Sequence, residues 1–205
     1  MLAKVTNVNI SKEDLRQKIA LAGGNPQAKT IDEAFLHTVK QPKLSHKPSN
    51  VVLVVGESFG QWPFLAQFKD LGLVDRMLAL QNSAHGAHIN TMLPHGSGTI
   101  IAINGLITGL PDTGLYENYS PLSMKKKYAM GIGYIMQQLG YKTVFWYGGF
   151  PGWQNIKYFS VAQSFDELHC ADEFGDVGGN AWGCPDDILL DKVAEYMAAE
   201  QAGQK

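Results

Sequence analysis

The sequence predicts an α/β domain in which a mostly parallel sheet is sandwiched by helices. Residues 51–55 are five apolar residues, four of them β-branched, and glycine follows at position 56, as in a short strand buried on both faces. Later in the chain, helix-like and strand-like segments alternate. The chain has 205 residues, 45% of them hydrophobic, which suits one domain with a full core.

Residues 1–49 are expected to form a helical preface and a connector. Ser11 with Asp14, and Thr30 with Glu33, fit the capping-box pattern that opens a helix. Apolar residues follow at helical spacing in both segments, and Gly23 is expected to end the first helix. Residues 41–49 carry two prolines and two lysines without periodicity, which is typical of an extended connector.

Residues 50–205 are expected to form the N-terminal part of a catalytic domain, beginning with a strand over Asn50–Val55. A first crossover helix is predicted over residues 62–71 and a second strand over residues 86–93. A glycine-rich turn then leads into residues 99–108, which are too apolar to be exposed and are read as a buried helix that begins with Thr99.

The rest of the chain repeats helices and strands. Apolar residues at positions 132, 135, 136 and 139, with Gly140 in the C′ position, predict a helix that is followed by a strand over residues 142–147. We further predict a helix over residues 154–162, a short strand over residues 164–168, and an amphipathic helix that Pro185 starts.

The charge and composition of the chain indicate which classes of partner to expect. The formal net charge is −2, and the lysine run at residues 125–127 is short, so no nucleic-acid partner is expected. No apolar stretch reaches the ~18 residues of a membrane span, and the first 25 residues lack the core of a secretory signal. Any membrane attachment is expected outside this chain. Cys170 and Cys184 are read as free buried thiols, or as a pair in an oxidising compartment.

One candidate chemistry is that of a serine esterase. Residues 56–60, Gly-Glu-Ser-Phe-Gly, match the GxSxG nucleophile elbow of α/β-hydrolases, with Ser58 as the nucleophile. However, that fold needs several strands before the elbow, and the first 49 residues read as helical and connective. The late pair Asp166 and His169 is also too close in sequence to complete a triad.

A second candidate chemistry uses Glu57 and Thr99. Glu57 follows the predicted strand, where open α/β sheets bind ligands. Thr99 opens the buried helix, and backbone amides at a helix N-terminus bind phosphate or sulfate oxygens. A divalent cation held by Glu57 and bound to the Thr99 hydroxyl lowers the pKa of that hydroxyl and makes it a nucleophile. Plain capping roles for both residues remain open.

Four blocks together resemble the sulfatase-fold phosphoglycerol transferases of the alkaline phosphatase superfamily, which include lipoteichoic acid synthase and the enzyme that decorates periplasmic glucans. The blocks are the strand with Gly56-Glu-Ser-Phe59, the helix opened by Ser97-Gly-Thr99, Tyr147-Gly-Gly149 with Trp153, and residues 180–186, Asn-Ala-Trp-Gly-Cys-Pro-Asp. The resemblance begins near Asn50 and extends into the last helix.

The resemblance implies that Glu57 is a metal ligand, that Thr99 is a ligand and the covalent nucleophile, and that Trp153 lines a glycerol-phosphate pocket. Lipoteichoic acid synthases place a phosphate-contacting arginine two positions after this tryptophan, where this chain has Asn155. The implied cofactor is one divalent ion, which is manganese, magnesium, zinc or calcium. The implied substrate is an anionic phospholipid or another phosphate or sulfate ester.

The resemblance also implies ligands that this chain lacks. The family completes its metal site with an Asp-His pair far downstream, and no Asp-His dipeptide occurs in these 205 residues. We therefore expect a partial catalytic domain of a parent at the outer face of the cytoplasmic membrane or in the periplasm. An inactive fragment that self-associates through an unpaired sheet edge is the non-enzymatic alternative.

Overall fold

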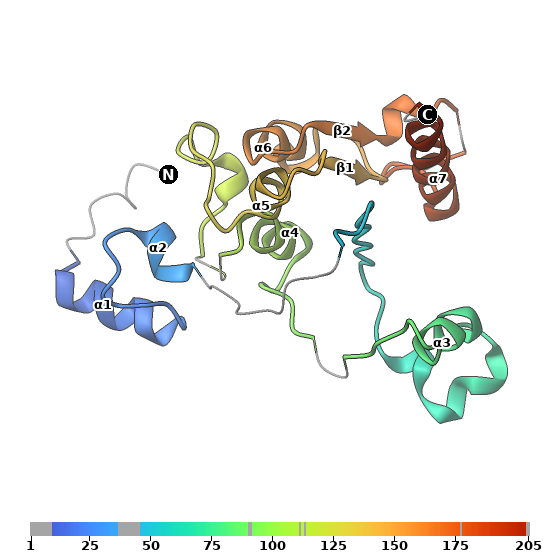
Figure 1. Cartoon of the computed structure of the whole chain (residues 1–205), viewed down its shortest axis with the longest axis horizontal. Coiled ribbons are helices and arrows are strands. Elements are labelled where there is room, and N and C mark those ends of the chain that lie inside the picture. The colour runs from blue at the N-terminus through green and yellow to red at the C-terminus, as the bar shows by residue number, and fades with distance from the viewer. Residues whose placement is uncertain are drawn as a thin grey trace. The chain divides into compact units, whose positions relative to one another are not determined.

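The computed structural model describes residues 10–36, 46–89, 92–110, 112, 114–176 and 178–203. The chain forms two compact units: residues 1–38 with 95–205, and residues 39–94 (Figure 1). The first unit contains the sheet and most of the helices.

The sheet of the first unit consists of two parallel strands, β1 (Val144–Tyr147) and β2 (Glu167–Cys170). Their register pairs Val144 with Glu167 and Tyr147 with Cys170. The parallel pairing confirms the predicted α/β class. The strand expected over residues 164–168 begins three positions later, because Ser164 has a left-handed φ of 74° and residue 165 is still tied to the preceding helix turn.

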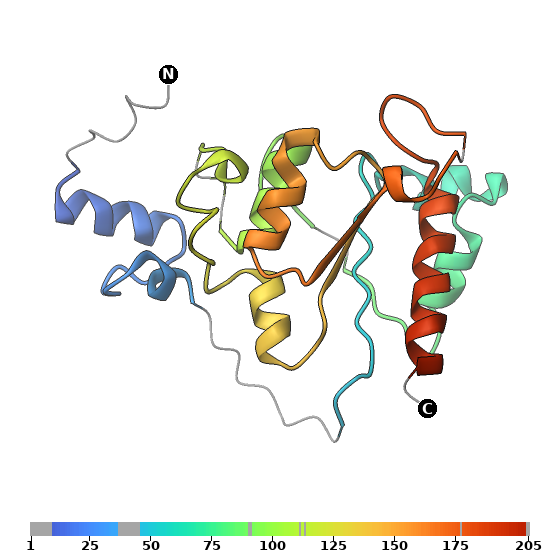
Figure 2. The same ribbon diagram turned by 90° about the horizontal axis from the view of Figure 1, so that it is seen from above.

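Helices cover both faces of this sheet (Figure 2). Side chains alternate along a strand, so Phe145 and Tyr147 share one face and Trp146 lies on the other. The first face packs on Ile107 of α4 (Thr99–Thr108) and on Ile156 and Phe159 of α6 (Ile156–Ala162), all three of which are fully buried. The opposite face meets α7 (Asp186–Gly203).

Several helices begin and end where the local signals predict. In α1 (Lys12–Leu21) the Ser11 side chain accepts the Asp14 backbone N–H, and in α2 (Ile31–Phe35) Thr30 accepts that of Glu33. Helix α4 has the predicted bounds. Helix α5 (Ile132–Gln138) is followed by Gly140, whose φ of 76° suits the predicted C′ position.

A second apolar cluster joins the first helices to the rest of this unit. Ile19 of α1 and Ala34 and Phe35 of α2 are buried together with Leu110, which follows α4. Three short 3₁₀ segments complete the unit: η4 (Glu117–Tyr119), η5 (Trp153–Asn155) and η6 (Ala171–Glu173).

The unit of residues 39–94 corrects the predictions made for it. Residues 51–55 form no strand, and their side chains are 53–69% exposed, since no neighbouring strand in the described part of the chain supplies hydrogen bonds to them. The described residues 86–89 and 92–93 form no strand either, and positions 90–91 lie outside the described residues.

The crossover helix expected over residues 62–71 is two 3₁₀ segments, η2 (Trp62–Phe64) and η3 (Ala66–Leu71). The extended backbone of Leu65 separates the two segments and interrupts the α-helical pattern. Gly72 ends the second segment with a left-handed φ of 62°, as predicted, and α3 (Asp75–Gln81) follows.

Candidate active site

Thr99 occupies the first position of α4 and is half-buried. The residue before it, Gly98, is extended and has no side chain with which to cap the helix. His95 packs against Gly105, where a Cβ atom would collide with it, so the turn that leads into α4 folds back along the helix. The structure therefore places the Thr99 hydroxyl at a helix N-terminus, where the helix dipole favours anions.

Glu57 lies in an exposed turn that follows residues 51–55. The next residue, Ser58, has a left-handed φ of 55°, which is uncommon for a residue other than glycine. Glu57 belongs to the unit of residues 39–94 and Thr99 to the other unit. The sharing of one cation by these two side chains therefore stays a prediction.

Trp153 lies in the loop that follows β1. Its ring is 5.7 Å from that of Tyr147, the last residue of β1, measured between centroids. The two residues after it, Gln154 and Asn155, have left-handed φ values of 47° and 57°. This turn brings Trp153 and Asn155 together at the carboxyl end of β1, the position where parallel sheets bind ligands.

Three loops meet at this end of the sheet. The backbone carbonyl of Gly148 accepts the Cys184 N–H at 2.8 Å, and that of Gly149 accepts the Ala171 N–H at 3.0 Å. Gly183 has a φ of 136°, and a Cβ atom there would collide with the Gly148 carbonyl. The Gly148-Gly149 turn and the 180–184 loop, both blocks of the family resemblance, are therefore held against each other.

Buried amides connect α4 to the loop that carries Trp153. Asn104 of α4, 1% exposed, donates to the Asn118 side-chain oxygen at 2.9 Å and to the Glu117 carboxylate at 3.4 Å. Asn118 donates to the Gln154 backbone carbonyl at 2.7 Å, and Asn155 donates to the Asn118 backbone carbonyl at 2.6 Å. Sequence reasoning missed these contacts. The signal was Asn104, a polar residue in the middle of an apolar helix.

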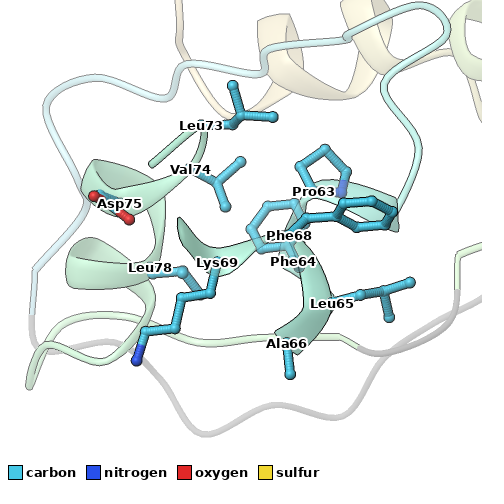
Figure 3. Close-up of a pocket in the computed structure, with 10 residues that line it drawn as sticks. All are labelled: Pro63, Phe64, Leu65, Ala66, Phe68, Lys69, Leu73, Val74, Asp75 and Leu78. Carbon is cyan, nitrogen blue, oxygen red and sulfur yellow. The ribbon is translucent and has the colours of Figure 1, made fainter. Parts of the chain in front are cut away.

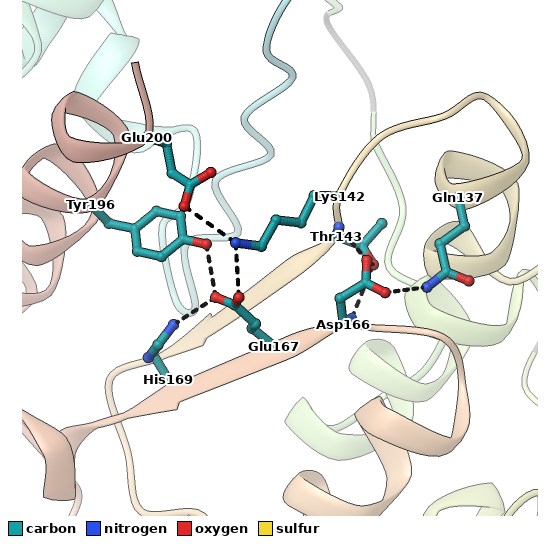
Figure 4. A network of polar contacts seen from close by, with 8 residues as sticks. All are labelled: Gln137, Lys142, Thr143, Asp166, Glu167, His169, Tyr196 and Glu200. Atoms are coloured by element: carbon teal, nitrogen blue, oxygen red, sulfur yellow. Dashed lines mark hydrogen bonds and ion pairs between the residues drawn. The ribbon is translucent and has the colours of Figure 1, made fainter. Parts of the chain in front are cut away.

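A second polar network lies between the sheet and α7 (Figure 4). Glu167 of β2 pairs with Lys142 at 2.8 Å and accepts a hydrogen bond from the Tyr196 hydroxyl at 2.7 Å. These contacts, with Lys142 the largest, hold the pKa of Glu167 at about 2, and Glu167 in turn raises the pKa of Lys142. His169 lies between Glu167 and Glu173 and stacks on Trp146 at 4.4 Å. This network fastens α7 to the sheet.

Of the two readings of the cysteines, the structure has the free thiols: Cys170 is buried and Cys184 is partly buried. Burial raises the pKa of Cys170 to about 12 and also raises that of Cys184. Because the thiolate is the reactive form, the raised pKa lowers the reactivity of the buried Cys170 at neutral pH.

A small apolar hollow of about 60 Å³ lies within the unit of residues 39–94 (Figure 3). Pro63, Phe64 and Phe68 line one side, and Val74 and Leu78 line another. Lys69 and Asp75 also line it, and none of the candidate site residues Glu57, Thr99, Trp153 and Asn155 does.

Glu57 and Thr99 are the two residues proposed to bind a divalent cation. A carboxylate and a hydroxyl are oxygen ligands that suit a hard cation. Within the residues that the structure describes, no three His, Cys, Asp or Glu side chains gather as a metal site. The resemblance assigns two metal ligands to this chain, Glu57 and Thr99. Across the same residues, no helix is long and apolar enough to span a membrane.

The sequence profile of the sulfatase family matches residues 49–205, so this chain belongs to the sulfatase family. The match supports a sulfatase-like hydrolase or transferase in general, and members of this superfamily typically use a divalent metal. No curated protein matches the chain.

One solved structure, a protein of the alkaline phosphatase superfamily from Vibrio parahaemolyticus, is similar to part of the chain. It is 26% identical over 46% of this chain, with a TM-score of 0.42. The similar region spans 23% of that protein's length.

Proposed function

We propose that the natural protein containing this chain is a metal-dependent phosphoglycerol transferase, or a related phosphodiester or sulfate ester hydrolase, that acts through Thr99. The observation that carries the proposal is that Thr99 is the first residue of α4. The residue before it, Gly98, has no side chain that could cap the helix. Family membership adds that this chemistry is sulfatase-like. Membership alone leaves the nucleophile and the substrate open.

The proposed reaction has two displacements. The Thr99 hydroxyl releases its proton and its oxygen forms a bond to phosphorus while the bond to the leaving oxygen breaks, and the leaving alcohol takes up a proton. A sugar or lipid hydroxyl, or water, then attacks phosphorus and releases its proton, while the bond to Thr99 breaks and the threonine oxygen takes up a proton again. Backbone N–H groups at the N-terminus of α4 stabilise the phosphoryl oxygens.

Glu57 and the Thr99 oxygen are the residues of this chain that we assign to a divalent cation. When bound, such a cation lowers the pKa of the threonine hydroxyl and neutralises charge on the phosphoryl group. Trp153 is assigned to the pocket for the glycerol-phosphate part of the substrate, and Asn155 to the same pocket. An anionic phospholipid donor implies the outer face of the cytoplasmic membrane or the periplasm.

The test uses the natural protein with a phosphatidylglycerol donor, an aryl phosphodiester and an aryl sulfate as substrates. Thr99→Ala is expected to lower turnover on the order of 10³-fold or more, whereas Thr99→Ser retains part of it. Ser97→Ala is the matched control, because it removes a nearby hydroxyl and leaves the proposed nucleophile in place. Mass spectrometry of an acid-quenched reaction should find phosphate on the peptide that contains Thr99. Full activity of Thr99→Ala would exclude the assignment.

Metal dependence is tested separately. A chelator should abolish turnover, and one of manganese, magnesium, zinc or calcium should restore it in the wild type. In Glu57→Gln, restoration should need a higher concentration of the same ion, because a neutral amide is a weaker ligand than a carboxylate. Turnover that is indifferent to chelation would contradict this part of the proposal.

The alternative, a serine esterase that uses Ser58, is favoured by one observation. The φ of 55° at Ser58 agrees with the strained turn of a nucleophile elbow. The elbow follows a strand, however, and residues 51–55 form none here. Serine-directed phosphonates should inactivate such an esterase while chelators leave it active, which is the opposite of what the Thr99 proposal predicts.

A further inference from the structure

Three asparagines form a continuous path of hydrogen bonds across the first unit. The path begins at Asn104, five positions after Thr99 on α4, passes through Asn118 of η4 and ends at the turn that follows Trp153. Asn104 and Asn118 are 1% and 0% exposed. The path thus joins the helix of the proposed nucleophile to the loop of the proposed substrate pocket.

The contact between Asn118 and this turn is reciprocal. The Asn118 amide donates to the Gln154 carbonyl at 2.7 Å, while the Asn155 amide donates to the Asn118 carbonyl at 2.6 Å. Gln154 and Asn155 are both left-handed, a conformation that asparagine tolerates but that is uncommon for glutamine, so it requires support from the surroundings at Gln154. The two hydrogen bonds with Asn118 stabilise this turn, which directly follows Trp153.

Asn104 takes part in this path as a hydrogen-bond donor. Its amide nitrogen donates to both Asn118 and Glu117, whereas its buried side-chain oxygen Oδ1 accepts no hydrogen bond from the residues that the structure describes. An unpaired buried acceptor is costly, and an apolar residue at this position would avoid the cost. The asparagine is therefore explained by the two hydrogen bonds that it donates, which fix η4 on α4.

We propose that Asn118 and Asn155 are positioning residues that hold Trp153 in place relative to α4 and so set the affinity for the phosphoester. In this proposal Asn155 acts through the loop and is not itself a ligand of the substrate's anion. The inference rests on the proposed function of Thr99 and Trp153, and it specifies how the pocket is built where lipoteichoic acid synthases place an arginine.

The experiment compares variants of the natural protein with the same aryl phosphodiester. Asn155→Asp keeps the size and the tolerance of left-handed backbone but replaces the donor with a carboxylate that faces the Asn118 carbonyl. Asn118→Leu removes the other donor. Gln154→Gly is the matched control, because the path uses only the backbone carbonyl of Gln154 and glycine adopts a positive φ freely.

Each of the two asparagine variants is expected to raise KM on the order of 10-fold while kcat changes less than about twofold. Because both act on one loop, the double variant should be no worse than the worse single variant. Gln154→Gly should stay near wild type. Effects of Asn118→Leu and Asn155→Asp that multiply would mean that Asn155 binds the substrate directly, and would overturn the proposal.

A fluorescence measurement keeps the proposal testable without turnover. Each variant is also made with Trp153→Phe, and the difference between the two proteins isolates the emission of Trp153. Acrylamide should quench Trp153 about twofold more in Asn155→Asp than in the wild type, because the loop is released. Unchanged quenching would overturn the proposal even if Asn118→Leu fails to fold. An active Thr99→Ala variant would instead reject the assigned chemistry and leave the quenching result standing.

Discussion

Residues 144–147 and residues 51–55 are both short, apolar segments with residues that favour strands, but they have different structures. Val144–Tyr147 pairs with β2 along its full length and is half-buried on both faces. Val51–Val55 is unpaired and more than half exposed at every position. The two segments differ in what surrounds them far more than in their own composition.

The difference lies in the partners that each segment has. The Phe145 ring lies 5.2 Å from that of Phe165, between α6 and β2, and the Trp146 ring lies 5.5 Å from that of Tyr196 of α7, measured between centroids. Both faces of β1 are therefore covered. A strand is stable only when its backbone groups are hydrogen-bonded and its apolar side chains are covered. An apolar run supplies the tendency to form a strand, and the neighbouring chain segments decide whether one forms.

The largest difference between the two segments is expected in how much a substitution by alanine lowers the free energy of unfolding. Phe159→Ala, which removes a fully buried ring under β1, is expected to lower the free energy of unfolding by about 3–5 kcal/mol. Val54→Ala, at a side chain that is 69% exposed, should change it by less than about 0.5 kcal/mol. Urea unfolding followed by circular dichroism measures both. A large cost at Val54 would show that residues 51–55 are buried in solution.

Amide hydrogen exchange should give the next largest difference. The backbone N–H groups of β1 that are bonded to β2 should exchange on the order of 10²-fold more slowly than unprotected amides, since exchange requires local opening. Amides of residues 51–55 should exchange at nearly unprotected rates. Mass spectrometry of short peptides measures this exchange. Equal protection in β1 and in residues 51–55 would contradict the conclusion that only β1 is a hydrogen-bonded strand.

A smaller effect is expected at the contact between the sheet and α7. The pKa of Glu167 is about 2 in the folded protein against an ordinary 4.5, so its stabilising contribution is complete above pH 4.5 and is lost as the pH falls toward 2. Its side chain is 35% exposed, so solvent screening limits this contribution to about 1 kcal/mol.

Glu167→Gln should therefore destabilise the protein at pH 7 and flatten the loss of stability between pH 4.5 and 2. Glu195→Gln is the matched control, because Glu195 lies on α7 and its carboxylate, which pairs with Lys192, is more exposed than that of Glu167. This variant should neither destabilise the protein at pH 7 nor change the pH dependence of its stability. Unfolding curves at several pH values test this. A Glu167→Gln protein with the wild-type pH dependence would mean that α7 is not held to β2 through this carboxylate.

The smallest effect on stability is expected at Leu53, which is 57% exposed. Leu53→Lys should change the free energy of unfolding by less than about 0.5 kcal/mol. It should reduce self-association of the chain, because unpaired apolar segments of this kind pair between molecules and a lysine opposes that. Sedimentation velocity compares it with Leu53→Ile. The idea fails if both variants associate equally.

Local signals accounted for much of what is observed in the first unit. The capping pairs at Ser11 and Thr30 opened helices as predicted, and α4 has the predicted bounds. These features depend on residues within one helical turn of each other, so the sequence alone contains their cause. The position of Thr99 at the start of α4 follows from the same local rules.

Other features depend on residues far apart in the chain, and only the tertiary structure decided them. The Asn118 contacts with Gln154 and Asn155 span 36 and 37 positions, and Glu167 meets Tyr196 across 29. No periodicity or capping rule reports such pairs. The sequence by itself determined where α1, α2 and α4 begin and where α5 ends, because those signals are local. Tertiary packing determined which apolar run became a strand and which buried amides hold the candidate site, because both depend on partners brought together by folding.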